Sequence, residues 1–85
     1  MTNKEMMRQL YERMAAEQQK YKAWLLEQPP NVILDNACKF TVREDIVMEL
    51  EVLELTDAQA ADLLRSRTPL ADVYRAWERA ETHHM

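Results

Sequence analysis

The chain of 85 residues contains no glycine, and this absence constrains its fold more than any other feature. Phosphate-binding loops, the sharp turns that present catalytic serines and two-residue β-hairpin turns nearly all depend on glycine, because its backbone adopts positive φ at little steric cost. Most small-enzyme and nucleotide-binding designs are therefore disfavoured. The absence of glycine predicts a small helical domain.

Length and composition indicate a single domain, residues 1–85, that folds in water. At 10.1 kDa the chain is shorter than the roughly 100–150 residues of a typical domain. With 47% apolar and 31% charged residues, it is too apolar for a disordered segment and too charged for a membrane protein. Such a short chain buries only about 60–65% of its unfolded surface, so a partner or a second copy would add stability.

Four helix starts can be read from local chemistry. In a capping box, a threonine side chain accepts a hydrogen bond from the third helical amide, and an acid or amide at that position reaches back. Three capping boxes are predicted: Thr2 with Glu5, Thr41 with Glu44 and Thr56 with Gln59. The fourth start is Thr68 followed by Pro69, an N-cap and a first-turn proline.

The first helix is expected over residues 2–28, because Pro29 and Pro30 cannot continue it. A second helix is expected over about residues 30–40, and a third after Thr41, unless the two form one kinked helix. Apolar residues at steps of three and four residues predict which side of each of these three helices faces the core. These are Met7, Tyr11, Met14, Tyr21 and Leu25, flanked by Met6, Leu10 and Trp24; then Val32, Ile33, Ala37 and Phe40; then Val42, Ile46, Leu50 and Leu53. Asp35, Asn36 and Lys39 are expected to face outward.

Two further helices complete the expected fold. One runs from Thr56 to about Ser66 with Ala60, Leu63 and Leu64 inward, and one follows Pro69 with Leu70, Val73, Tyr74 and Trp77 inward. Residues 49–55 alternate partly like a strand, but their place before a helix cap favours helix. The sequence therefore predicts an all-α fold, a compact bundle of four or five helices with a long N-terminal helix.

Charge is concentrated in the middle of the chain. The net charge is −4, yet residues 44–64 carry seven acids and no Lys or Arg. Such a stretch is typical either of a hydrated helix face or of a surface that attracts basic proteins, since long-range fields steer encounters by sign. On the second interpretation, the partner-binding residues are Glu44, Asp45, Glu49, Glu51 and Glu54, together with Trp24 as an aromatic anchor.

No set of residues indicates catalysis, a metal or a cofactor. Asp45 and Glu49 lie one helical turn apart, but no apolar residue is expected beside them to desolvate a general acid. Cys38 is expected to be buried, and His83 and His84 point about 100° apart and form a tail. We therefore predict a protein that is not an enzyme and that needs no metal or cofactor.

Two alternatives to a protein-binding module remain open. Residues 56–80 read as helix, turn and helix, and Arg65, Arg67, Arg75 and Arg79 would contact phosphates in a helix-turn-helix DNA-binding regulator. The acidic preceding region disfavours this function. A self-associating domain is the other alternative: the stripe of the first helix would pair with a second copy in a homodimer, and Gln18 would set the register.

Nearly the whole chain is similar to a family of short, uncharacterised helical domains from clostridial bacteria and their mobile elements. The resemblance rests on Leu10-Tyr11, Glu17-Gln18, Tyr21, Trp24 to Pro30, Ile33-Leu34, Thr41 to Ile46, Leu55 to Asp57 and Pro69 to Tyr74. It implies a domain of unknown function without catalytic residues to transfer, and relatives that continue past Met85. The context of mobile elements implies an inhibitor of a host defence or nucleic-acid-handling complex, similar to an anti-CRISPR protein. With one cysteine and no signal segment, a cytoplasmic location is expected.

Overall fold

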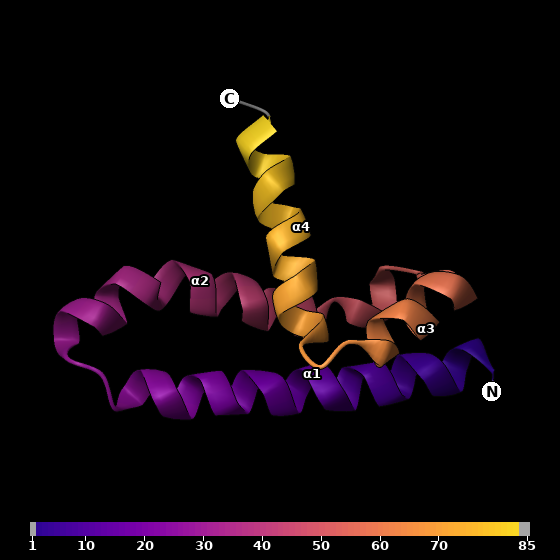
Figure 1. Ribbon diagram of the computed structural model, residues 1–85, viewed down its shortest axis with the longest axis horizontal. Helices are drawn as coiled ribbons and strands as arrows, with labels where there is room; N and C mark the ends of the chain where they lie inside the picture. Colours follow the sequence, from indigo (N-terminus) through magenta and orange to yellow (C-terminus); the bar gives the residue numbers. More distant parts are fainter. Residues whose placement is uncertain (1, 84–85) are drawn as a thin grey trace.

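The computed structural model describes residues 2–83, except for the side chains of 51 and 81–83, and within these residues the regular secondary structure is all helical, without strands. Its elements are α1 (Asn3–Leu26), α2 (Pro30–Met48), the short 3-10 helix η1 (Leu50–Val52), α3 (Asp57–Arg65) and α4 (Pro69–His83). In Figure 1, α1 and α2 form a long antiparallel hairpin, α3 lies near the N-terminal end of α1, and α4 rises away from the hairpin. The predicted all-α fold with a long first helix is confirmed.

The helix ends follow local chemistry at α1 and α3. Thr2 accepts from the amide of Glu5 at 3.2 Å, and α1 ends before the two prolines. At α3 both halves of the predicted capping box are present, because Thr56 and Gln59 exchange hydrogen bonds of 3.0 and 3.1 Å. A box of this kind satisfies two amides that the helix itself leaves without partners.

The capping box expected at Thr41 is wrong, because α2 runs without a break from Pro30 to Met48. The Thr41 hydroxyl instead donates to the carbonyl of Ala37 at 3.0 Å, a bond that a threonine makes within a helix. No proline or glycine interrupts this stretch. The alternative in which the two expected helices form one is therefore confirmed, although α2 runs on without the break that Thr41 was expected to introduce.

The segment after α2 is not the α-helix that the sequence favours. Glu49 ends α2, one 3-10 turn follows, and Glu54 adopts φ of 47°. Positive φ suits glycine and costs other residues roughly 1–2 kcal/mol. Because the chain has no glycine, a residue with a side chain, Glu54, adopts this conformation between η1 and α3.

The core lies where α1, α2, η1 and α4 meet. It consists of Leu10, Met14, Val47, Leu50 and Leu70, with Met7, Ala15, Ile46, Leu55, Leu63, Leu64 and Val73 packed around it. Between residues 19 and 42, Leu25 is the one buried apolar side chain. The closed end of the α1–α2 hairpin therefore adds little to this core.

The molecule is more extended than its mass predicts. A compact monomer of this mass exposes about 5,300 Å² of surface, whereas this chain exposes 6363 Å². Its radius of gyration is 13.8 Å, against about 12 Å for a compact domain of this length. The closed end of the hairpin and the projecting α4 account for the difference in shape (Figure 1).

Candidate functional site

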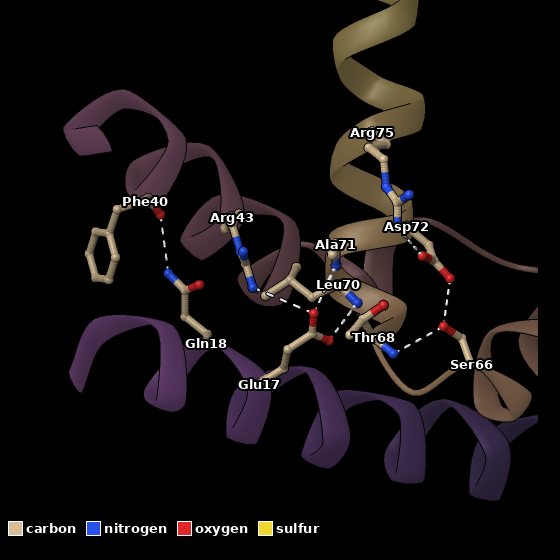
Figure 2. Close-up of polar contacts among 10 residues, drawn as sticks. All are labelled: Glu17, Gln18, Phe40, Arg43, Ser66, Thr68, Leu70, Ala71, Asp72 and Arg75. Atoms are coloured by element: carbon tan, nitrogen blue, oxygen red, sulfur yellow. Dashed lines mark hydrogen bonds and ion pairs between the residues drawn. The ribbon is translucent and has the colours of Figure 1, made fainter. Parts of the chain in front are cut away.

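The N-terminus of α4 is capped by a side chain from another helix. Leu70 and Ala71 donate their amides to the two carboxylate oxygens of Glu17 in α1, at 2.8 and 3.0 Å (Figure 2). Thr68 is the predicted N-cap, and its carbonyl accepts from the amide of Asp72 at 3.0 Å. The Thr68 side chain was expected to accept from the first free amides of α4, but Glu17 accepts from them instead. A carboxylate is favoured there because the N-terminal end of a helix dipole is positive.

Arg43 of α2 holds the same carboxylate. Its Nη2 lies 3.5 Å from Oε2 of Glu17, and the two side chains are only 7% and 15% exposed. The guanidinium also lies 4.4 Å from the ring centre of Tyr21, within cation–π range. Burial raises the pKa of Tyr21, and the charge of Arg43 offsets part of this rise. We call this cluster of Glu17, Arg43, Tyr21 and the first turn of α4 the Glu17 junction.

Gln18 belongs to the interior of its own chain. It is 2% exposed, and its Nε2 donates to the carbonyl of Phe40 at 3.1 Å (Figure 2). Two buried atoms beside this bond, Oε1 of Gln18 and Nε of Arg43, have no hydrogen-bond partner among the described residues. Met14 and Leu25, two other residues of the stripe that was expected to pair with a second copy, are buried as well. This part of α1 therefore packs inside its own chain and is not available to a second copy.

The turn between α3 and α4 is fixed by side chains as well. Arg13 of α1 donates to the carbonyls of Leu64 and Ser66, which places a cation at the negative end of the α3 dipole. The Ser66 hydroxyl accepts from the amide of Thr68 at 3.0 Å and donates to Asp72 at 2.6 Å. α1 therefore determines the direction in which α4 leaves the body of the protein.

This arrangement of α4 creates a groove against α2, with a volume of about 300 Å³. We call it the acidic groove; it is lined by Val42, Asp45, Ile46, Glu49, Leu53, Val73 and Trp77. Leu53 is 47% exposed and Trp77 is 39% exposed, although both were expected to face inward. Asp45 and Glu49 are exposed. The expectation that no apolar residue lies beside these two acids is therefore wrong.

The structure separates the residues that were expected to bind a partner. Asp45 and Glu49 line the acidic groove, whereas Glu44 is half-buried on α2 outside its lining. Glu54 is exposed in the segment before α3, and the side chain of Glu51 lies outside the described residues. Trp24 is 48% exposed and stacks on a ring of its own helix, Tyr21, with 6.0 Å between the ring centres. It is not part of the groove.

Several other side chains on α2 differ from expectation. Cys38 is exposed rather than buried, because α2 faces α1 through Asn36 and Phe40, and a residue between those two points away from α1. Asn36 and Lys39 were expected outward but are half-buried. Asn36 accepts from Tyr21 at 3.3 Å. Lys39 lies 5.6 Å from the ring centre of Tyr21 and 5.5 Å from that of Tyr74.

The arginines of the helix-turn-helix interpretation are exposed, but two of them have acidic neighbours. Arg65 lies 3.6 Å from Asp62, and Arg75 lies 2.9 Å from Asp72. Arg67 and Arg79 are also exposed. Pairing within the same helix lowers the positive charge that α3 and α4 present to a phosphate backbone.

Within the described residues, no three His, Cys, Asp or Glu side chains are grouped so that they could hold a metal ion. His83 has no described side chain, and His84 lies outside the described residues. No helix in the described part of the chain has both the length and the apolar character needed to cross a membrane. The acidic groove combines two exposed carboxylates with part-exposed apolar side chains in one concave surface.

Together, the fold and the groove define a small all-α domain with an acidic, partly apolar groove between α2 and α4. Comparison with protein families places the chain in the family described as "Protein of unknown function (DUF3848)", whose model matches residues 6–85. The chain belongs to this family. Neither the comparison with curated proteins nor that with solved structures gave a match.

Proposed function

We propose that this domain is a protein-binding module whose acidic groove takes a basic, amphipathic segment of a partner. The observation that carries the proposal is the groove itself, in which Leu53 and Trp77 are part-exposed beside the carboxylates of Asp45 and Glu49. Exposed aromatic residues in a concave surface are common anchors of protein interfaces. The two carboxylates favour a partner segment of positive charge, because complementary charge steers association and like-charged surfaces repel.

The size of the groove limits what it holds. Its volume of about 300 Å³ lies at the lower end of the roughly 300–1,000 Å³ of small-molecule pockets. One or two large apolar side chains fill such a space. An amphipathic helix supplies side chains in this arrangement, with apolar residues three and four positions apart and Lys or Arg at the edges.

A finer version of this proposal is an inhibitor of a host nucleic-acid-handling complex, acting on a basic surface that ordinarily contacts phosphates. It is supported by the seven acids of residues 44–64, which occur there without a single Lys or Arg. Of these acids, Asp62 is paired with Arg65, and Asp57 accepts from Asn3 at 2.7 Å. Asp45 and Glu49 are therefore the acids that we assign to the partner.

The test is a selection from a display library of random helical peptides, with the full chain immobilised. We expect the selected peptides to combine Lys or Arg with Leu, Phe or Trp at helical spacing. The variant D45K/E49K should weaken their binding at least about tenfold. The matched control is D35K/E27K, which makes the same change in net charge at exposed positions outside the groove and should alter binding by less than about twofold.

Two results would contradict the proposal. If both double variants weaken binding equally, the attraction is a general effect of net charge, and the groove has no part in it. If Trp77→Ala leaves the affinity of the selected peptides unchanged while helicity is retained, the peptides do not occupy the groove, because Trp77 forms part of its wall.

DNA binding is a second candidate because α4 projects from the hairpin (Figure 1) and carries two exposed arginines, Arg75 and Arg79. A recognition helix must project from the rest of the protein in order to enter the major groove. The candidate predicts that R75A/R79A lowers both the affinity for duplex DNA and its dependence on salt. Absence of DNA binding by the wild-type chain at low salt would remove it.

A further inference from the structure

The outer side of α2 carries a pattern of residues that no other element covers. Along it, Leu34, Ala37, Thr41, Glu44 and Met48 follow one another at alternating steps of three and four residues. This spacing is that of the a and d positions of a coiled coil, and it places all five on one side of the helix. Leu34 is 75% exposed and Met48 is 73% exposed. Leu34, Ala37 and Met48 are apolar, and an exposed row of apolar side chains on a helix is suited to contact with another helix.

α1 extends the same surface. Ala37 and Thr41 form one wall of a groove of about 240 Å³, and Lys22 and Leu26 of α1 form part of the other. Leu26 is 67% exposed. We call this surface the hairpin face: the seam of α2 and the adjoining Lys22 and Leu26.

The remaining helices pack on other sides of the hairpin. α4 contacts α1 through Glu17 and approaches α2 at Lys39 and Ile46. α3 contacts α1 through Arg13. Glu17 and Arg13 lie well away from Lys22 around the helix, because each residue turns the direction by about 100°. The hairpin face is thus left without an intramolecular partner among the described residues.

We infer that a second copy of this chain packs on the hairpin face, so that two hairpins form a two-fold symmetric four-helix arrangement. The surface area supports this occupant. The chain exposes 6363 Å², about 1,100 Å² more than a compact monomer of its mass. Each partner in a standard interface buries about 800 Å². The excess of the whole chain is larger than one such share, and the closed end of the hairpin is, with α4, one of the two parts that depart from a compact shape (Figure 1).

Charge distinguishes this face from the acidic groove. The hairpin face carries one charge of each sign, Lys22 and Glu44, so it does not repel a copy of itself. The acidic groove carries Asp45 and Glu49 and would repel its own copy. The two sides of α2 are therefore suited to different partners. If no basic segment binds in the acidic groove, the proposed dimer contact on the hairpin face is unaffected, and the converse also holds.

Charge also fixes the direction in which the two α2 helices pair. In a parallel pair Glu44 would lie against its own copy, which is unfavourable. In an antiparallel pair centred on Thr41, the two Glu44 residues lie about 9 Å apart along the axis. Leu34 of one protomer then meets Met48 of its partner. The small side chains of Ala37 and Thr41 near the centre allow the helices to approach closely.

Disulfide crosslinking tests the position and the direction of this contact, with Cys38→Ser as background. In the antiparallel dimer, Thr41→Cys should form a covalent dimer under mild oxidation. Leu34→Cys alone should not, because its copies lie about 20 Å apart along the axis. A mixture of Leu34→Cys and Met48→Cys should crosslink as a pair. Crosslinking of Leu34→Cys with itself and not with Met48→Cys would overturn the antiparallel arrangement.

Sedimentation equilibrium of the full chain tests the dimer itself. Leu34→Glu should raise the dimer Kd at least about tenfold without changing helicity, since Leu34 is already exposed in the protomer. The matched control is Leu53→Glu, at an apolar residue that is 47% exposed and lines the acidic groove instead of this face. A wild-type chain that remains monomeric up to about 1 mM, the weak end of specific association, would overturn the inference. An equal effect of both variants would do the same.

Discussion

The two ends of the α1–α2 hairpin differ in what holds them together. At the open end, the core and the Glu17 junction join three helices, and Leu10, Met14 and Leu70 are fully buried. At the closed end, two helices lie side by side with Leu25 as their one buried apolar residue and with Leu34 exposed. Stability is therefore concentrated at the open end. The closed end is left free to contact another molecule, because two helices alone cannot cover both of their apolar sides.

The strongest way to break this comparison is to truncate one leucine at each end. Leu70→Ala removes a fully buried side chain and should lower the free energy of unfolding by about 3 kcal/mol. Leu34→Ala should lower it by less than about 0.5 kcal/mol in the monomer. Urea denaturation at low protein concentration measures both. Equal losses would show that the closed end is packed as tightly as the core.

A smaller loss is expected when the junction loses its carboxylate. Glu17→Ala leaves the amides of Leu70 and Ala71 uncapped and the buried Arg43 without its ion pair. We expect a loss of about 2–3 kcal/mol.

The control for this variant is Glu12→Ala, which removes an exposed partner of Arg8 on the same helix. It should cost no more than about 0.5 kcal/mol. Thermal unfolding followed by circular dichroism distinguishes the two variants. If Glu17→Ala is as mild as the control, the direction of α4 is set by the apolar contacts of Leu70 alone.

The smallest effect concerns pH at the Glu17 junction, to which Tyr21 belongs. Burial raises the pKa of Tyr21 above its ordinary value of 10.0. The folded chain therefore keeps this proton at a pH where the unfolded chain has lost it, so stability falls as the pH rises above about 10. Tyr21→Phe should lose less stability between about pH 9 and about pH 11 than the wild type does.

The measurement is urea denaturation at both pH values. Tyr11→Phe, at a residue that is 44% exposed, serves as the control and should follow the wild type. If the free energy of unfolding of Tyr21→Phe falls as steeply with pH as that of the wild type, the hydroxyl of Tyr21 is not desolvated at the Glu17 junction.

The chemistry of the acidic groove was only partly predictable. The sequence places Asp45 and Glu49 one turn apart, because helical spacing is a local property. It does not show that Leu53 and Trp77 lie beside them, since the groove depends on where α4 crosses α2. Cys38 was expected to be buried from its residue type, yet its burial depends on which side of α2 meets α1. Such information arises from packing between segments that are distant in sequence.

The sequence by itself determined the helices and most of their ends. Pro29 and Pro30 end α1, and Thr56 with Gln59 starts α3, because these effects act within one turn of backbone. Only the tertiary structure decided which side chain caps α4 and in which direction the helix points. The amides that Thr68 was expected to cap are held by Glu17, more than fifty residues earlier in the chain. The half-buried carboxylate of Glu17 finds its partners across the fold, so its role depends on the arrangement of the three helices around it.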